Sequence, residues 1–180
     1  IDADAVKTGM LGSAALVEQV AESLDAMARE TPRIIAPVMV ATSGDTLVDE
    51  KAISAIAALM IPGATLLTPN APEAEVLTGK AVDGINGQRR AAEALLERGA
   101  KGVLVKGGHV PGRVVIDVLQ TEHGEWIFES ERIETTSTHG TGCTLASACA
   151  SASRPLFSVC RTSTAMSLGD DNQISLAKIP

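Results

Sequence analysis

Aromatic residues are nearly absent from this 180-residue sequence, which has two phenylalanines, one tryptophan and no tyrosine. So few rings cannot build the base-stacking platform of a protein that binds single-stranded nucleic acid. A basic surplus is lacking as well, because the formal net charge is -7. Binding to a phosphate backbone needs clustered lysine and arginine. Both shortages argue against a nucleic-acid partner.

Long apolar runs and paired cysteines are also missing. No stretch approaches the ~18 uncharged apolar residues of a membrane-spanning helix, and no basic and apolar signal sequence opens the chain. The three cysteines include no C-x-x-C pair, which excludes a complete disulfide framework and a four-cysteine zinc site. We therefore expect a cytoplasmic protein with reduced thiols and no membrane partner. The first residue is Ile1 rather than Met, so we also expect a fragment.

Apolar runs alternate with segments of helical period through the first 150 residues. The expected strands are 3–8, 33–41, 64–68 and 101–106, the expected helices are 13–29, 49–60, 72–79, 88–98 and the segment entered from the Gly-rich turn at 137–150, and a hairpin is expected over 114–128. Alternating strands and helices indicate crossover units and a mainly parallel sheet. Ligands bind such sheets beyond the carboxyl ends of the strands.

The last thirty residues differ from the rest. Arg, Ser, Thr and Gly are scattered through 151–180 without helical or strand period, and a polar cluster lies at 170–173. We therefore divide the chain into a core, residues 1–150, and a divergent, disordered tail, residues 151–180.

The strongest local signal is the Gly-rich segment 138–144 (THGTGCT). Gly140 and Gly142 let the backbone approach a ligand closely, and the following helix directs its N–H groups and positive dipole end at that ligand. The segment therefore predicts a site for a phosphate or a transferring phosphoryl group. The same dipole favours the thiolate form of Cys143. Taken alone, a tight turn with a small buried cysteine explains the segment equally well.

Polar residues follow two other predicted strands. Asn70 and Glu73 supply an amide oxygen and a carboxylate, which suit Mg²⁺, although a helix cap with a glutamate in the first turn is the commoner meaning of this pattern. Lys106, ahead of two glycines, suits a nucleotide phosphate or is an ordinary solvated lysine. Because these segments follow strands of one sheet, together they predict a phosphoryl-transfer site.

Five segments carry a wider pattern: VKTGMLGSA (6–14), PVMVATSGD (37–45), TPNAPEAEVLTG (68–79), VKGGH (105–109) and THGTGCTLASA (138–148). In this order they resemble the hydroxymethylpyrimidine/phosphomethylpyrimidine kinases of thiamine biosynthesis, members of the ribokinase-like superfamily. The resemblance implies a three-layer α/β/α fold with a mainly parallel central sheet and a missing N-terminal part. It implies ATP-dependent phosphorylation of hydroxymethylpyrimidine and of its monophosphate. The implied partners are ATP, Mg²⁺, the pyrimidine and, in the intact family member, a second identical subunit.

The same resemblance implies a role for each residue of the predicted site. The family has an anion hole beside a candidate base, an Asn-x-x-Glu motif and a lysine at the nucleotide phosphates, and apolar residues along the pyrimidine pocket. Here these positions are Gly140, Thr141 and Gly142 for the anion hole, Cys143 for the base, Asn70 and Glu73 for Mg²⁺, Lys106 for ATP, and Met10 and Val38 for the pocket.

Three departures from the family pattern motivate an alternative outside enzymes. The family's polar substrate-recognition segments precede Ile1, Ala36 stands where the family has Asp before Pro-Val-Met, and the amphipathic helix that follows in the family is not matched after Ser151. That alternative is a non-catalytic, truncated remnant of the kinase. The alternative enzyme is a pyridoxal kinase of the same superfamily, whose variants can also carry the cysteine.

Overall fold

The computed structural model describes residues 3–27, 30–40, 47–133 and 140–162. Within these residues one six-stranded sheet has the order β1 (Val6–Thr8), β2 (Arg33–Ile35), β3 (Leu66–Leu67), β4 (Gly102–Val105), β5 (Val114–Thr121) and β6 (Gly124–Glu131). Strands β1 to β4 run parallel, whereas β5 and β6 are added as an antiparallel hairpin. The predicted parallel sheet and the predicted hairpin are both confirmed.

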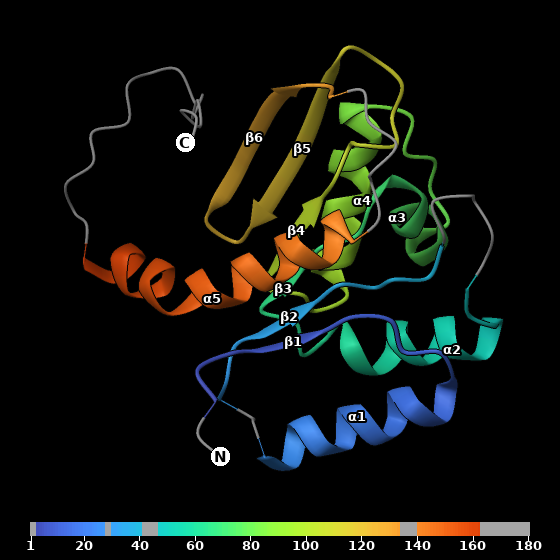
Figure 1. Ribbon diagram of the computed structural model, residues 1–180, viewed down its shortest axis with the longest axis vertical. Helices are drawn as coiled ribbons and strands as arrows, with labels where there is room; N and C mark the ends of the chain where they lie inside the picture. Colours follow the sequence, from blue (N-terminus) through green and yellow to red (C-terminus); the bar gives the residue numbers. More distant parts are fainter. Residues whose placement is uncertain (1–2, 28–29, 41–46, 134–139, 163–180) are drawn as a thin grey trace.

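Helices cover both faces of this sheet, as Figure 1 shows. One side carries α1 (Ala14–Met27), α2 (Glu50–Ala55) with the π-helical turn η1 (Ile56–Met60), α3 (Ala71–Thr78) and α4 (Ile85–Glu97), while α5 (Thr141–Thr162) crosses β1 and β2 on the other side. The helices on one side, the central sheet and α5 on the other side therefore form three layers, as predicted.

Side-chain caps begin two helices, and a glycine ends a third. The Leu16 N–H donates to Ser13 Oγ at 3.3 Å, which starts α1, and the Ala52 N–H donates to Asp49 Oδ1 at 2.7 Å, which starts α2. Gly79 ends α3 with a φ of 70°, a left-handed conformation that a residue without Cβ adopts freely.

The larger core lies between the sheet and α1 to α4, and the smaller one lies under α5. Fully buried residues of the larger core include Val17, Met39, Ile61, Leu67, Leu95, Val103 and Val105. Under α5, Ile34 and Ala36 pack against Ala146. Because strand side chains alternate between faces, Ile34 and Ile35 of β2 enter different cores.

All four expected parallel strands are shorter than the sequence predicts, and the runs 33–41 and 64–68 show this most clearly. The run 33–41 forms a strand only over Arg33–Ile35, because Pro37 has no N–H to donate and the Val38 N–H bonds to the Ala36 carbonyl at 2.8 Å instead. The run 64–68 pairs as a strand only at Leu66–Leu67.

The segment after residue 150 also differs from the prediction. Helix α5 continues to Thr162, so the expectation that regular structure ends at Ser151 is wrong for residues 151–162. Residues 163–180, like residues 41–46, lie outside the described residues. The division into a core and a tail stays a prediction.

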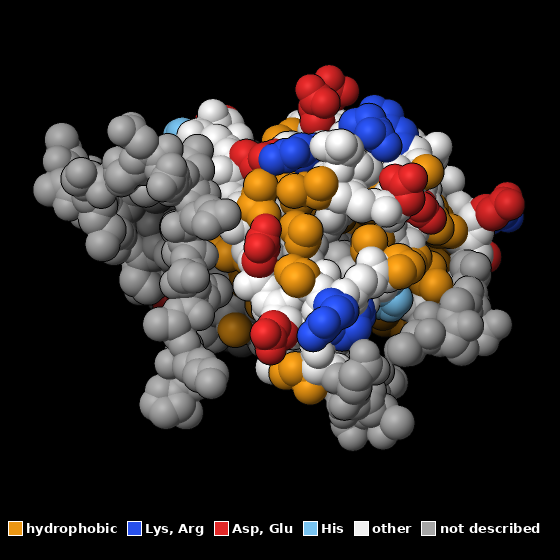
Figure 2. Space-filling model, turned by 90° about the horizontal axis from the view of Figure 1, so that it is seen from above, with side chains coloured by type: hydrophobic (Ala, Val, Ile, Leu, Met, Phe, Trp, Pro, Cys, Tyr) orange, Lys and Arg blue, Asp and Glu red, His pale blue; other side chains and the backbone are white. Residues whose placement is uncertain are grey.

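Acidic and basic side chains are interspersed on the face that Figure 2 shows, with hydrophobic side chains between them. That face therefore presents no broad field of one sign. Among the described helices, none combines the length and the apolar character that crossing a bilayer requires.

Candidate functional site

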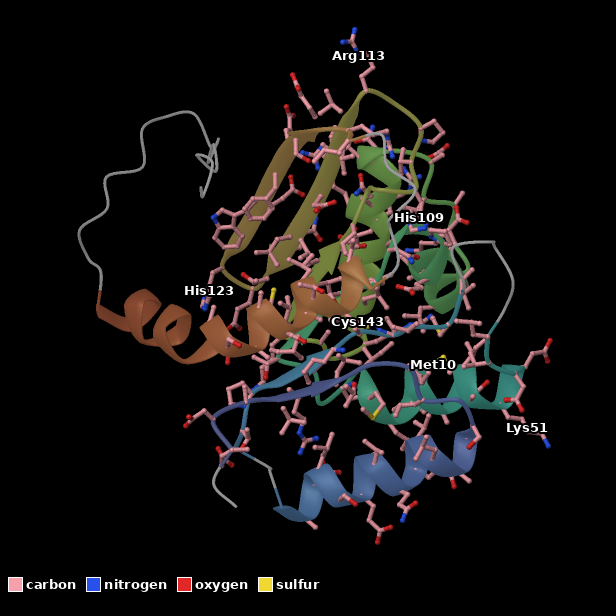
Figure 3. The ribbon with its side chains drawn as sticks, in the orientation of Figure 1. Met10, Lys51, His109, Arg113, His123 and Cys143 are labelled. Carbon is pink, nitrogen blue, oxygen red and sulfur yellow. The ribbon has the colours of Figure 1, made fainter. Side chains whose placement is uncertain are left out.

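The carboxyl ends of β1 to β4 and the first turn of α5 meet at one edge of the sheet. Asn70, after β3, and Lys106, after β4, form a parallel bridge, and the Lys106 N–H donates to the Pro69 carbonyl at 2.9 Å. In Figure 3, Met10 and Cys143 lie at this edge, whereas His123 lies at the far turn of the β5–β6 hairpin. The structure thus brings the predicted segments together.

The Lys106 ammonium lies against the first turn of α5. A Cβ built on Gly142 would be only 3.1 Å from Lys106 Nζ, so the glycine leaves the space that the ammonium occupies. The N-terminus of a helix carries a partial positive charge and N–H groups that have no acceptor within the helix. Two positive features from different elements therefore converge at one point, where an anion would be stabilised by both.

The Gly-rich segment forms a tight helix start. Gly140 has a φ of 82°, a left-handed conformation, and its carbonyl accepts from the Thr144 N–H at 3.0 Å and from Thr144 Oγ1 at 3.1 Å. Gly142 and Cys143 follow in the first turn and are both half-buried. The first two residues of the predicted segment, Thr138 and His139, lie outside the described residues.

Asn70 and Glu73 form a reciprocal capping box at the start of α3. The Glu73 N–H donates to Asn70 Oδ1 and the Asn70 N–H donates to Glu73 Oε2, each at 2.8 Å. Glu73 is 4% exposed, and this burial raises the pKa of its carboxyl against the opposing effects of hydrogen bonds from the Asn70 and Met39 backbones and of the Lys106 charge. The helix-cap interpretation is therefore correct, and it places the carboxylate close to Lys106.

The chemistry of these two oxygen donors fits Mg²⁺. The described part of the chain contains no cluster of three or more His, Cys, Asp or Glu side chains that could hold a metal. Mg²⁺ needs no such cluster, because one or two protein oxygens commonly hold it together with phosphate oxygens and water. Asn70 Oδ1 and the Glu73 carboxylate keep unused lone pairs beside their capping bonds.

The turn after β4 is held by two side chains that the sequence analysis did not single out. The Gly107 N–H donates to Asp117 Oδ1 at 2.8 Å. Gln88 Nε2 donates to the carbonyls of Val105 at 3.1 Å and Ile116 at 2.7 Å. One signal was present in the sequence, since Asp117 is the single charged residue of the apolar run 114–119 (VVIDVL).

Arg132 fixes the loop that follows this turn. Its guanidinium donates to three backbone carbonyls of residues 108–112 at distances of 2.6 to 2.8 Å. His109 lies in this loop, where partial desolvation and the Lys106 and Arg132 cations lower the pKa of its imidazole. The loop beside Lys106 is thus anchored at its start by Asp117 and along its length by Arg132.

Two residues expected in a pyrimidine pocket follow neighbouring strands. Met10 is 55% exposed after β1, and Val38 is half-buried after β2, where it packs against the small core under α5. Ala36, the position where the family pattern has Asp, is buried in that core. The roles of Met10, Val38 and Cys143 stay predictions.

Comparison of the sequence with known proteins identifies a family that this chain matches. Residues 1–160 match the family model described as phosphomethylpyrimidine kinase. A hydroxymethylpyrimidine/phosphomethylpyrimidine kinase from Streptomyces coelicolor is 45% identical over 150 residues, which are 83% of this chain and 55% of that protein. The chain spans about half the length of the curated relatives it matches.

Solved structures show the same fold. The ADP complex of Bacillus subtilis pyridoxal kinase superposes with a TM-score of 0.77 at 31% identity, covering 84% of this chain and 57% of that chain. The phosphomethylpyrimidine kinase of Clostridium difficile gives a TM-score of 0.72 at 34% identity, covering 82% and 59%. The ribokinase-like α/β fold implied by the sequence is confirmed.

Proposed function

The chain belongs to the phosphomethylpyrimidine kinase family, and on that premise we propose that it binds ATP and phosphorylates hydroxymethylpyrimidine and then its monophosphate in thiamine biosynthesis. The observation that carries this proposal is the Lys106 ammonium beside Gly142 at the start of α5. A phosphoryl group needs positive charge on several oxygens at once as it transfers. The lysine and the helix N-terminus supply that charge from two directions.

Each part of the site then has a task in phosphoryl transfer. The backbone N–H groups of Gly140, Thr141 and Gly142 receive the oxygens of the γ-phosphate, and Lys106 neutralises charge on the nucleotide phosphates. Cys143 takes the proton of the substrate hydroxyl while the hydroxyl oxygen bonds to phosphorus and ADP leaves. Most of the rate enhancement comes from positioning and charge stabilisation rather than from covalent chemistry.

Asn70 and Glu73 are the residues that would hold Mg²⁺. Asn70 forms a backbone bridge with Lys106, the Lys106 charge acts on the Glu73 carboxyl, and the side-chain oxygens of both residues retain lone pairs for an ion or for its bound water. When bound, Mg²⁺ neutralises charge on phosphate oxygens. The capping box keeps both side chains in one orientation, which lowers the entropy lost on binding.

Met10 and Val38 line the pyrimidine pocket in this proposal, because both follow parallel strands at the edge where α5 begins. The proposal also includes the homodimer expected for the family and a cytoplasmic location. A pyridoxal kinase activity is the second candidate, since a pyridoxal kinase gives the TM-score of 0.77 quoted above.

Calorimetric titration of the chain with MgATP tests the proposed phosphate site. We expect Lys106→Met to weaken binding ~10-fold or more, since a hydrogen bond to a charged group contributes ~1.5–3 kcal/mol. Lys101→Met is the matched control, because Lys101 is exposed at the opposite end of β4. Equal affinities of the two variants would contradict the proposed role of Lys106.

A coupled assay of ADP release tests the substrate. Hydroxymethylpyrimidine, its monophosphate and pyridoxal are compared at equal concentrations with the same chain. Turnover of the first two supports the proposal, turnover of pyridoxal alone supports the second candidate, and MgATP binding without any turnover supports the non-catalytic remnant.

A further inference from the structure

We propose that Asp117 is a positioning residue of the phosphate site, whose carboxylate fixes the turn after β4 and thereby keeps the Lys106 ammonium at the start of α5. The inference deepens the proposed function and rests on it. Asp117 acts through Gly107 and Lys106, and it is not itself placed against the nucleotide.

Asp117 and Lys106 lie next to the last pair of the β4–β5 ladder. Val105 pairs with Val118 there, and Lys106 and Asp117 each lie one residue beyond this pair, in line with the same register. Opposed residues of a ladder direct their side chains to the same face of the sheet. Lys106 reaches Gly142 of α5 on that face, so Asp117 stands next to the lysine on the α5 side.

The backbone between the two side chains is held on both sides. The Gly107 N–H is bound to Asp117 Oδ1 at 2.8 Å, and the Ile116 carbonyl occupies the position where a Cβ of residue 107 would lie. The Gln88 amide fixes this carbonyl at 2.7 Å, so the carbonyl cannot move away. A turn clamped in this way has one conformation, and the direction in which Lys106 leaves the strand is set with it.

The Asp117 side chain is half-buried, so its carboxylate depends on these partners for stabilisation. Desolvation raises the pKa of Asp117, while the Gly107 hydrogen bond and the Lys106 charge oppose that rise. A charge buried away from water is destabilising unless it is paired and hydrogen-bonded. Both groups that compensate Asp117 belong to the turn after β4.

Amide hydrogen exchange at Gly107 tests the clamp without any ligand. We expect Asp117→Ala to speed exchange of this amide ~10-fold or more, because its acceptor is lost, and Asp117→Asn to preserve protection, because an amide oxygen still accepts. Glu129→Ala, at an exposed acidic residue of β6, is the control. Should Asp117→Ala not fold, Asp117→Ser replaces it, since a serine hydroxyl is too short to reach the Gly107 N–H.

A double-mutant cycle with Lys106→Met tests the functional half of the inference. Calorimetry with MgATP should show ~10-fold weaker binding for Asp117→Ala in the wild-type background, near wild-type binding for Asp117→Asn, and no additional loss when Lys106→Met is already present. Equal losses in both backgrounds, or an equal loss for Asn and Ala, would overturn the inference. Unchanged Gly107 exchange in Asp117→Ala would also overturn it, whereas a wild-type chain that binds no MgATP would overturn the proposed function.

Discussion

Gly107 is the glycine whose replacement should perturb the site most. A Cβ built at this position overlaps the Ile116 carbonyl oxygen and lies 3.0 Å from Gln88 Nε2. The carbonyl is backbone and is held by the Gln88 amide, so neither group can move without breaking another contact. Gly107→Ala must therefore displace the turn itself, and with it the hydrogen bond to Asp117.

The expected loss of stability follows from these two effects. Overpacking a well-packed site destabilises by ~1–3 kcal/mol, and a hydrogen bond to a charged acceptor contributes ~1.5–3 kcal/mol. We expect a combined loss of about 3 kcal/mol or more, a large share of the ~5–15 kcal/mol that stabilises a domain. For a chain of this length the midpoint of thermal unfolding should fall by roughly 6–12 °C.

Gly108→Ala is the matched control for this prediction. No atom lies within 4 Å of a Cβ built on Gly108, and this residue is exposed. We expect its free energy of unfolding to stay within ~1 kcal/mol of wild type. Urea unfolding followed by circular dichroism and by fluorescence of the single tryptophan, Trp126, measures both variants. Equal midpoints for the two variants would refute the packing argument.

Three further predictions concern ionisable side chains. Because the pKa of Asp117 is raised above 3.8 by burial, Asp117→Asn should gain stability over wild type as the pH rises above that value and show no gain below it. Because the Arg89 hydrogen bond lowers the pKa of Glu125 below 4.5, Glu125→Gln should lose ~0.2–1 kcal/mol of unfolding free energy at pH 7 and nothing once the pH falls below the folded pKa. Denaturant unfolding across pH measures both variants, and a stability change of the same sign in both at pH 7 would contradict these two predictions. Cys143→Ala should lower kcat ~10²-fold, whereas Cys149→Ala should leave kcat unchanged. Burial raises the pKa of Cys149, so iodoacetamide should label this thiol more slowly in the folded chain than in the urea-unfolded chain.

Features that depend on a few neighbouring residues could be predicted from the sequence. Helix α3 is an example, because Asn70, Glu73 and Gly79 carry the start and the stop of the helix within ten positions. The hairpin is another, since the polar turn at 121–124 lies between two apolar runs. The meeting of the carboxyl ends of the parallel strands at one edge of the sheet could be predicted from the alternation of strands and helices alone.

Features that depend on distant pairing could not be predicted in this way. The Asp117 carboxylate binds the Gly107 N–H across ten residues, and this contact exists only in one register of β4 and β5. The end of β2 depends on which carbonyl the Val38 N–H finds after Pro37. The small and polar residues after Ser151 did not indicate a helix, yet α5 extends through them. Local helix propensity is a weak guide to such an extension.

The charges around Lys106 explain why one lysine can organise the whole site. Glu73 and Asp117 both carry burial-raised pKa values, and in each the Lys106 charge opposes the rise. Removing the lysine would leave the buried Glu73 carboxylate and the half-buried Asp117 carboxylate without their shared cation, which is destabilising in a medium of low polarity. A bound phosphate would compete with these carboxylates for the ammonium, so the helix N-terminus must supply the additional positive charge. The position of Lys106 between α3, β5 and α5 therefore couples the stability of the strand ends to the binding of an anion.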